Sequence, residues 1–597
     1  MIDRRRLLLT AAAGGALCAA PALARASRDA DARLDALMAQ RFEESLERSP
    51  ERATSLGLDR GDKAHLASRL TDASPEAVEA NRVRARREWE ELQALDTTGL
   101  SEAGRINHAV AAFSAETTAL GTRFTYGSGI GRPGPYVINQ LAGSYFNTPD
   151  FLANQHHIED ATGAEAYLSR LEAFADTLGH ETTRIESDAA QGVALTSVIL
   201  DKTISQVSAL RDTPTDRTTL VAALARKTEA LGLAGYDARA AALVDQRIKP
   251  ALERQVAVLE AQRGTAGEDV GVWRLPDGEA FYAQGLRANT TTTLGADEIH
   301  QMGLEQVAEI SAEIDAIMRP LGMTQGTVGE RVTALNNDPQ YLYPNTDEGR
   351  AELLASLNAQ VEALEPLLPA MFGRLPRSSV EIRRVPVEIQ TGAPGGYYQG
   401  PPLDGSRPGA YYINLRDTAN WPKFALPTLT YHEASPGHHL QVALQRESAH
   451  LPDWRRAGGF SAYNEGWALY AESVAGDDLD VYADDPVGRI GYLLSYLFRA
   501  TRLVVDTGLH DKRWSRQQAI DYMVAQGVKP PNAAQSEIDR YCVMPGQACA
   551  YKVGHTVIAR LREEAEARPG FDLRAFHDRL LENGSMPLAV LEDVMRA

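Results

Sequence analysis

The chain has 597 residues, and its 61 lysines and arginines against 80 aspartates and glutamates give a net charge of −19. Hydrophobic residues make up 44% of it, which is enough for a large core. The acidic balance argues against a nucleic-acid-binding protein, and three cysteines are too few for a disulfide scaffold or a cysteine-built metal cluster.

Residues 1–26 have the form of an export signal. Consecutive arginines precede an uncharged, mostly apolar stretch, residues 7–24, and Ala24-Arg25-Ala26 has the small-x-small form of a signal-peptidase site. The arginines and the leucines after them resemble a twin-arginine signal, with an ordinary secretory signal as the alternative. Cys18 lies in the apolar stretch, but its neighbours fit a lipoprotein site poorly. We expect an exported protein, periplasmic or secreted, whose net charge is −22 once these four arginines and one aspartate are removed.

The region 27–375 is predicted to be helical. Apolar residues recur at three- and four-residue spacing over residues 34–46, and Gly- and Pro-rich stretches at 126–150 and 264–295 interrupt the helical pattern. Further helices are expected at 83–95, 106–120, 164–178, 181–210, 217–231, 236–262, 297–318 and 348–364.

The region 376–597 begins with a short β-containing segment. Residues 380–390, 397–398 and 410–415 have strand character, and Gly and Pro cluster between them. Helices resume at residue 428 and continue to the end. The chain is therefore predicted to be mainly α, a large multi-helical fold with a small β ribbon or sheet in its second part.

Two further features bear on the mature chain. No stretch after residue 26 approaches the 18 uncharged apolar residues of a membrane-spanning helix, so no transmembrane segment is expected there. Cys542 and Cys549 lie seven residues apart around a Pro-Gly pair. In an oxidising compartment they would form a disulfide; otherwise they would be two buried thiols.

The main chemical signal is the sequence HEASPGHH at residues 432–439. In the motif HExxH, histidines at i and i+4 share one face of a helix and bind zinc, while the glutamate is the general base. Here position i+4 is Pro436, which cannot bind a metal. Without Ser435 and Pro436 the motif spacing would be restored. We therefore expect a two-residue insertion that bulges the helix, with His438 in the second ligand position beside His432. Pro436 and Gly437 would permit such a distortion.

His439 is the alternative second ligand. On an uninterrupted helix it would lie two turns from His432, roughly 10 Å along the axis, which is far for two imidazoles that share one ion. We therefore favour His438. The interpretation without a metal is a polar helix end capped by histidines.

A third ligand is expected from a second helix, because catalytic zinc sites keep three protein ligands and one open position. Residues 464–468, Asn-Glu-Gly-Trp-Ala, resemble the Asn-Glu-Gly-Phe-Ala stretch of the aminopeptidase N family, in which the glutamate is the third ligand. This resemblance makes Glu465 the candidate. Glu472, seven residues further on, would either hold a ligand histidine by a hydrogen bond or be a solvated carboxylate.

Four motifs between residues 431 and 554, HEASPGHH, NEGWALYAE, RLVVDTGLH and PGQACAYKVG, together resemble the bacterial family catalogued as domain of unknown function 885. That family is grouped with the gluzincin metallopeptidases and is often exported. The resemblance implies a zincin-like catalytic region and zinc-dependent hydrolysis. The Gly-Ala-Met-Glu-Asn strand of aminopeptidase N is missing, so recognition of a substrate amino terminus is not implied.

The implied mechanism is hydrolysis assisted by Zn²⁺, with Glu433 taking a proton from water and passing it to the leaving amine. The tetrahedral oxyanion then needs a hydrogen-bond donor. Tyr551 is the first candidate, and Tyr541 and His510 are the others. For each tyrosine, simple packing in the core is the competing interpretation.

Substrate contacts are expected from two places. The segment 409–415, GAYYINL, precedes the histidine motif as an edge strand does in zincins, which makes Tyr411, Tyr412 and Asn414 candidates for contact with a peptide. Arg499 and Arg502 lie three residues apart on one helix face and would grip a peptide carboxylate. A salt bridge to Asp506 is the alternative role of these arginines.

The sequence therefore predicts an exported zinc metallopeptidase that acts on short peptides, with the helical region 27–375 as a roof over the catalytic region 376–597. The first alternative is a zinc hydrolase of a non-peptide amide or ester, related to the cell wall. The second is an inactive protein that binds peptides. The intact Glu433 argues against the second.

Overall fold

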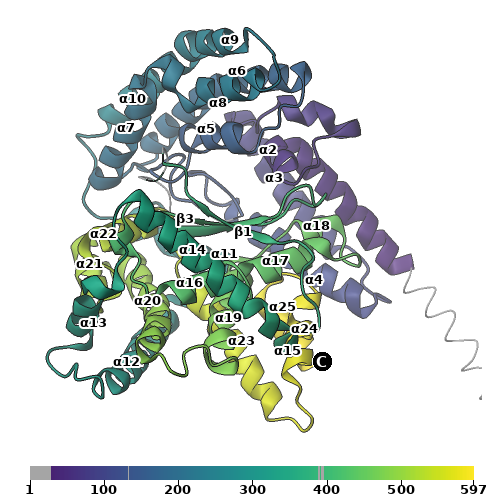
Figure 1. The fold of residues 1–597 in the computed structure, drawn as a ribbon. Coiled ribbons are helices and arrows are strands. Elements are labelled where there is room, and N and C mark those ends of the chain that lie inside the picture. Colours follow the sequence, from purple (N-terminus) through teal and green to yellow (C-terminus); the bar gives the residue numbers. More distant parts are fainter. Residues whose placement is uncertain (1–28, 132–133, 388–389, 391–394) are drawn as a thin grey trace, which may run out of the picture.

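The computed structural model describes residues 29–131, 134–387, 390 and 395–597. In this part the chain is mainly α-helical with one small three-stranded sheet, which confirms the predicted fold class (Figure 1). The predicted export signal and Cys18 lie outside the described residues. Among the helices that the structure describes, none combines the length and the apolar character of a membrane span.

The first part of the chain is a succession of helices that begins with a helix at residues 29–48. The helices that follow are α2 (Pro50–Ser55), α3 (Pro75–Gln93), α4 (Glu102–Gly121), α5 (Ser144–Asn154), α6 (Ala161–Ala190), α7 (Ser197–Asp212), α8 (Thr219–Glu229), α9 (Tyr236–Leu243), α10 (Lys249–Ala261), α11 (Gly278–Thr290), α12 (Ala296–Met318), α13 (Val328–Asn336), α14 (Asp347–Leu364) and α15 (Leu368–Met371). Side-chain caps start several of them. Ser74 accepts a hydrogen bond from the backbone of Ala77 at 3.2 Å, for example.

Several helix boundaries differ from the prediction. α11 lies within residues 264–295 and α5 begins within residues 126–150, two stretches expected to interrupt the helices, and α3 begins at Pro75 rather than at residue 83. The sequence favours a break near Gly179, but α6 runs without interruption to Ala190 and ends before Gly192. Gly192 has φ +83°, a conformation that favours glycine and stops a helix. A glycine inside a helix costs only about 1 kcal/mol relative to alanine, so Gly179 weakens α6 without ending it.

The small sheet consists of β1 (Val380–Arg384), β2 (Gly396–Gln399) and β3 (Gly409–Ile413), in the order β1-β3-β2. β3 pairs parallel with β1 and antiparallel with β2, so that Tyr411 lies between Ile382 and Tyr398. The expected edge position of the segment 409–415 is therefore wrong. The reason is that β1 joins the sheet beside β3, which leaves β1 and β2 as the edges.

The second part of the chain returns to helices. They are α16 (Leu426–Glu433), α17 (His438–Glu447), α18 (Asp453–Arg456), α19 (Ser461–Ser473), α20 (Pro486–His510), α21 (Arg516–Ala525), α22 (Pro531–Val543), α23 (Ala550–Glu566), α24 (Leu573–Glu582) and α25 (Leu588–Arg596). Figure 1 shows α5 to α10 on one side of the sheet and α16, α19, α20 and α23 on the other.

One hydrophobic cluster extends from Ile106 to Met595 and joins both parts of the chain. α12 packs along α20, and α11 contacts α19 and α23. Elements on both sides of the predicted boundary at residues 375/376 thus share one core, and that boundary stays a prediction.

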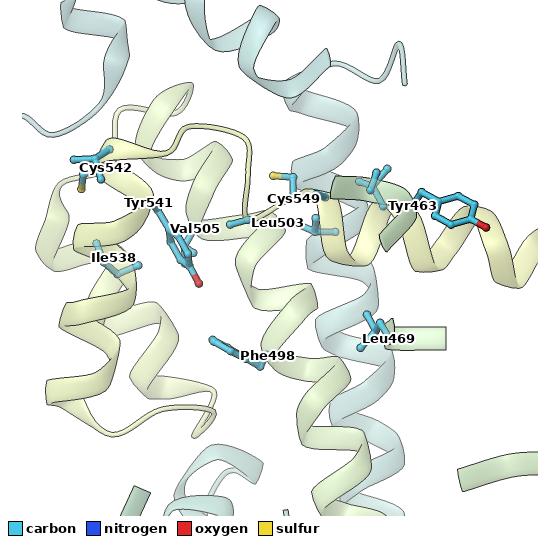
Figure 2. Close-up of a cluster of buried hydrophobic side chains, with 14 of the residues drawn as sticks. Tyr463, Leu469, Phe498, Leu503, Val505, Ile538, Tyr541, Cys542 and Cys549 are labelled. Carbon is cyan, nitrogen blue, oxygen red and sulfur yellow. The ribbon is translucent and has the colours of Figure 1, made fainter. Parts of the chain in front are cut away.

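The two cysteines of the second part are free and buried. Figure 2 shows Cys542 beside Tyr541 on α22 and Cys549 near Leu503, which lies on α20. Burial raises the pKa of both thiols above the usual range. Of the two states that the sequence leaves open, a disulfide and two buried thiols, the structure therefore shows the two buried thiols.

Candidate metal centre

The histidine motif is split between two helices, a larger distortion than the predicted bulge. α16 ends at Glu433 and α17 begins at His438. A Cβ atom on Gly437 would lie 2.0 Å from the carbonyl oxygen of His432, so only glycine fits where the chain folds back on itself. The indole of Trp467 on α19 donates to the carbonyls of Pro436 at 3.0 Å and Gly437 at 3.3 Å. These contacts fix the break and set the direction in which α17 leaves it.

The break brings His432, His438 and Glu465 together. One ligand atom from each side chain lies within 4.8 Å of the other two. The Nε2 atoms of His432 and His438 lie 3.6 and 3.3 Å from Oε2 of Glu465, and the two imidazole rings are nearly perpendicular. His432 is buried, whereas His438 and Glu465 keep 13% and 19% of their side chains exposed. Solvent therefore reaches the group from one side.

Glu472 contacts the ring nitrogen of His432 that does not face Glu465. Its Oε1 lies 2.8 Å from Nδ1 of His432, and its side chain has no exposed area. Since Nδ1 is engaged by Glu472, Nε2 is the atom that His432 presents to Glu465 and His438. The hydrogen bond, rather than a solvated carboxylate, is the role that the structure gives Glu472.

The charges in this group are strongly coupled. Burial opposes a charge on His432, but the carboxylates of Glu465 and Glu472, which interact with its two ring nitrogens, outweigh burial and raise the pKa of His432 to about 9. Burial likewise opposes a charge on Glu465, but the positive charge of His438 and the hydrogen bonds of both histidines keep its pKa well below the usual range. A buried carboxylate and two imidazoles thus form a site with a preference for a cation.

His439 lies apart from this group. Its Nδ1 is 2.9 Å from the hydroxyl of Tyr398, and its Nε2 is 2.9 Å from the carbonyl oxygen of Ser378. Burial lowers the pKa of His439 to about 4. Both ring nitrogens are therefore occupied in holding α17 against the sheet and the segment before it.

Glu433 lies next to the group in the chain and is buried, with 6% of its surface exposed. Its Oε2 has no hydrogen-bond partner among the described residues. Burial raises the pKa of Glu433, and the neighbouring histidines oppose that rise. A Cβ atom on Gly396 of β2 would lie 3.7 Å from Oε1 of Glu433, so this edge strand borders the carboxylate directly.

The three predicted oxyanion donors occupy different places. Burial and the charge of Glu465 raise the pKa of Tyr551, which lies at the start of α23. The hydroxyl of Tyr541 donates to Glu537 at 2.6 Å, and this tyrosine is fully buried. Both ring nitrogens of His510 contact backbone groups, and 1% of this residue is exposed. Of the three, Tyr551 is the one whose surroundings connect it with the candidate ligands.

Two glycines bring Tyr551 close to Glu465. α19 and α23 cross at Gly466 and Gly554, where a Cβ atom on Gly554 would lie 1.9 Å from the carbonyl oxygen of Ala462. Glu465 immediately precedes one of these glycines, and Tyr551 lies about one turn before the other. The close crossing thus sets the distance between the candidate ligand and the candidate donor.

The predicted substrate residues of the sheet are only partly accessible. Tyr411 is fully buried, and its hydroxyl has no hydrogen-bond partner among the residues that the structure describes. Tyr412 stacks on Tyr397 with ring centroids 5.0 Å apart. The side-chain amide of Asn414 donates to the carbonyl oxygen of Gln390 at 2.7 Å. Tyr411 therefore packs under the strand, and Asn414 fixes the loop beside it.

The predicted arginines lie on α20. Arg502 pairs with Glu537 at 3.3 Å, not with Asp506. Asp506 instead accepts hydrogen bonds from the hydroxyl of Tyr282 and the backbone of Gly546. The alternative role that the sequence leaves open for the arginines, a salt bridge to Asp506, is therefore wrong.

Sequence reasoning missed three charged neighbours of these arginines, Lys529, Glu537 and Arg540. They precede or lie on α22, some 30 to 40 residues after Arg499, and no local spacing connects them with it. A signal was present only in the pair Glu537 and Arg540, three residues apart on one helix, at 3.0 Å in the structure.

The chain belongs to the family described as "Bacterial protein of unknown function (DUF885)", whose model matches residues 50–595. This confirms the resemblance seen in the sequence. The crystal structure of a candidate lipoprotein from Colwellia psychrerythraea is similar, with 36% identity and a TM-score of 0.91 over 95% of this chain and 98% of that chain.

A candidate lipoprotein of unknown function from Shewanella oneidensis shares the fold. Its TM-score is 0.65 with 17% identity, over 95% of this chain and 100% of that chain. None of the curated proteins matches this chain.

Proposed function

We propose that this chain is an exported zinc-dependent metallopeptidase that hydrolyses peptide bonds of short peptides. The observation that carries the proposal is the convergence of His432, His438 and Glu465, with the carboxylate of Glu433 beside them. Two imidazole nitrogens and one carboxylate oxygen are a donor set that suits zinc, and Oε2 of Glu465 lies 3.6 and 3.3 Å from Nε2 of His432 and of His438.

The residues around the group are suited to hydrolysis. A zinc ion held there supplies a Lewis acid for the activation of water and of a scissile carbonyl. The unpartnered Oε2 of Glu433 would accept the proton of the attacking water and deliver it to the leaving amine. Tyr551 would donate a hydrogen bond to the oxyanion that forms on the carbonyl.

A peptide has an accessible strand to pair with beside Glu433. β2 lies at the edge of the sheet and Gly396 borders the carboxylate, so β2 takes the role that the sequence assigned to β3. The stacked rings of Tyr397 and Tyr412 would contact the peptide from this strand and its neighbour.

Export is supported by the sequence of residues 1–26 and by the similarity to candidate lipoproteins. The flanks of Cys18 favour cleavage near residue 26 over lipidation. Mass spectrometry of the protein from the periplasm of its host is expected to give an unmodified N-terminus near residue 25 or 27. A chain that begins with lipidated Cys18 would contradict cleavage at that place, and an uncleaved chain in the cytoplasm would contradict export.

The experiment that tests the activity compares two proteins. The purified, zinc-loaded chain is incubated with a mixed library of short peptides, next to the variant Glu433→Gln, and the products are identified by mass spectrometry. We expect cleavage by the natural chain, and a loss of at least about 100-fold in the variant with zinc still bound, since general-base catalysis contributes that much.

Each alternative has its own result in this experiment. Zinc binding without cleavage of any peptide would favour a hydrolase of a non-peptide amide or ester. Peptide binding without zinc and without cleavage would favour an inactive peptide-binding protein. Either result would overturn the proposal.

A further inference from the structure

Four positively charged side chains gather beside the candidate metal centre around a single carboxylate. Arg499 and Arg502 come from α20, Arg540 from α22, and Lys529 from the turn before α22. We call these four residues the cationic cluster. Its carboxylate is Glu537. The charges thus leave a local excess of positive charge in a chain whose net charge is −19.

One carboxylate oxygen of Glu537 already accepts three hydrogen bonds. One oxygen, Oε2, accepts hydrogen bonds from Arg540 at 3.0 Å, from Tyr541 at 2.6 Å and from Arg502 at 3.3 Å. Burial opposes its charge, but the surrounding cations hold the pKa of Glu537 well below the usual range. Glu537 therefore neutralises part of the cluster through this oxygen, and one carboxylate cannot balance four cations.

Two cations of the cluster form no close ion pair in the described part of the chain. Neither Arg499 nor Lys529 forms an ion pair with any residue that the structure describes. Nε of Arg499 and Nη1 of Arg502 are buried donors without a hydrogen-bond partner in the same part of the chain. Burial, together with Arg499 and Arg502, lowers the pKa of Lys529 to about 8. Donors in this state are costly unless a ligand satisfies them.

Aromatic rings hold the guanidinium groups in fixed positions. The guanidinium of Arg502 lies between the rings of Phe498 and Tyr551, at 4.1 and 4.4 Å from their centroids. The ammonium of Lys529 lies 4.5 Å from the same Phe498 ring, and Arg499 packs near both rings. Figure 2 shows Phe498 and Tyr541 directed into the space between α20 and α22. Such preorganised cations lose little entropy on binding an anion.

The cationic cluster borders the candidate metal centre. The ring of Tyr551 contacts Arg502, and the charge of Glu465 helps to raise the pKa of the same tyrosine. Burial raises the pKa of Glu433, and the charge of Arg499 is among those that oppose this rise. The side chains of Arg502 and Arg540 keep 8% and 18% of their area exposed, so a solute reaches the cluster.

We propose that the cationic cluster binds a carboxylate of the substrate, and thereby positions a peptide with its scissile bond at the metal centre. This inference rests on the proposed peptidase function and names its substrate class. Guanidinium groups bind carboxylates in a bidentate manner, and two orphaned donors from neighbouring arginines suit that geometry. Two groups of a peptide carry this chemistry: the C-terminal carboxylate and the side chain of an aspartate or glutamate.

Three peptides of otherwise equal sequence distinguish these sources with the zinc-loaded full chain. The first has a free C-terminal carboxylate and no acidic residue, the second is its C-terminal amide, and the third is an amide with one glutamate. We expect the first or the third to be cleaved with a kcat/KM about 10- to 100-fold above the second, the strength of one charge-assisted hydrogen bond. Preference for the first assigns the cluster to the C-terminus, and preference for the third assigns it to an acidic side chain.

Substitution of Arg499 ties the preference to the cluster. In Arg499→Gln the ratio of kcat/KM for the preferred peptide to that for the amide without glutamate is expected to fall about 10-fold or more. The side chain of Arg499 bonds only to Ser495 among the described residues, so this variant is expected to fold. Lys529→Gln is a second variant with the same expectation. Arg489→Gln is the matched control, because Arg489 lies on the same helix but pairs with Asp477.

Equal kcat/KM for all three peptides would overturn the inference while the cleavage itself upheld the proposed function. If no peptide is cleaved, the proposed function fails. Calorimetric binding of the three peptides to zinc-loaded Glu433→Gln then tests whether the cationic cluster binds a carboxylate. Equal affinity for all three peptides in that measurement, or a preference that Arg499→Gln leaves unchanged, would contradict the cluster as a carboxylate site.

Discussion

At the residue scale, two side chains without a place in the candidate ligand set hold it together. Trp467 donates to the two carbonyls at the break between α16 and α17, and Glu472 fixes the ring of His432. Both lie on α19, which also carries Glu465. One helix thus supplies a candidate ligand and supports both histidines. The spacing of Glu465, Trp467 and Glu472 within NEGWALYAE allows α19 to make all of these contacts.

The sequence was informative about residues whose chemistry is local. The spacing around Pro436 predicted that a distortion brings His438 beside His432, although as a bulge rather than as a break between two helices, and the resemblance of residues 464–468 pointed to Glu465. Contacts between distant helices left no such pattern. The hydrogen bonds of Trp467 to the break, and the approach of Lys529 and Arg540 to Arg502, depend on tertiary packing alone.

The two adjacent histidines give a prediction for single residues. His438→Ala is expected to weaken zinc binding by at least about 100-fold, because a ligand is lost. His439→Ala is expected to keep stoichiometric zinc, and to lower the free energy of unfolding by about 1–3 kcal/mol through its two buried hydrogen bonds. Competition with a zinc chelator and chemical denaturation measure the two effects.

The pair serves as its own control, since the variants differ by one position in the sequence. Loss of zinc in His439→Ala with zinc retained in His438→Ala would show that the candidate ligand set is misassigned.

At the element scale, the crossing of α19 and α23 sets the geometry of the site. Gly466 and Gly554 allow the two backbones to meet, and a Cβ atom on Gly466 would lie 2.5 Å from the backbone carbonyl carbon of Gly554. The sequence predicted these helices but not their crossing, because a glycine within a helix does not indicate which other helix packs against it. The order of the strands failed for a similar reason. β1 lies about 30 residues before β3, and nothing in either segment encodes their parallel pairing.

Gly554→Ala tests the crossing. The added methyl group would overlap the carbonyl oxygen of Ala462, so α19 and α23 are expected to separate, with a loss of about 1–3 kcal/mol in the free energy of unfolding. Because Glu465 and Tyr551 would move apart, peptidase activity is expected to fall by more than the loss of folded protein explains.

Gly179→Ala is the control for this change. Gly179 lies inside α6, and a methyl group added there would have no described atom within 4 Å, so alanine is expected to stabilise the protein by about 0.5–1 kcal/mol. Thermal and chemical unfolding of both variants measures the difference. Unchanged stability and activity in Gly554→Ala would contradict the role of the crossing.

At the scale of the whole molecule, the fold class could be predicted but its assembly could not. Helical periodicity identified α4, α8, α12 and α14 to within about four residues, and the turn residues located the small sheet, but α5 and α11 lie where the sequence predicted interruptions. That the core extends from Ile106 to Met595, and that α11 and α12 pack on the helices of the second part, follows from contacts over hundreds of residues. The roof expected over the site is therefore continuous with the site's own core.

The metal content of the purified protein is the most direct test of the account. Native mass spectrometry after dialysis against zinc, with X-ray absorption at the zinc edge, gives the stoichiometry and the ligand types. We expect one zinc ion per chain with two imidazole ligands, and no bound zinc when His432, His438 and Glu465 are all replaced by alanine. A natural chain without zinc, or a triple variant that retains it, would contradict the account.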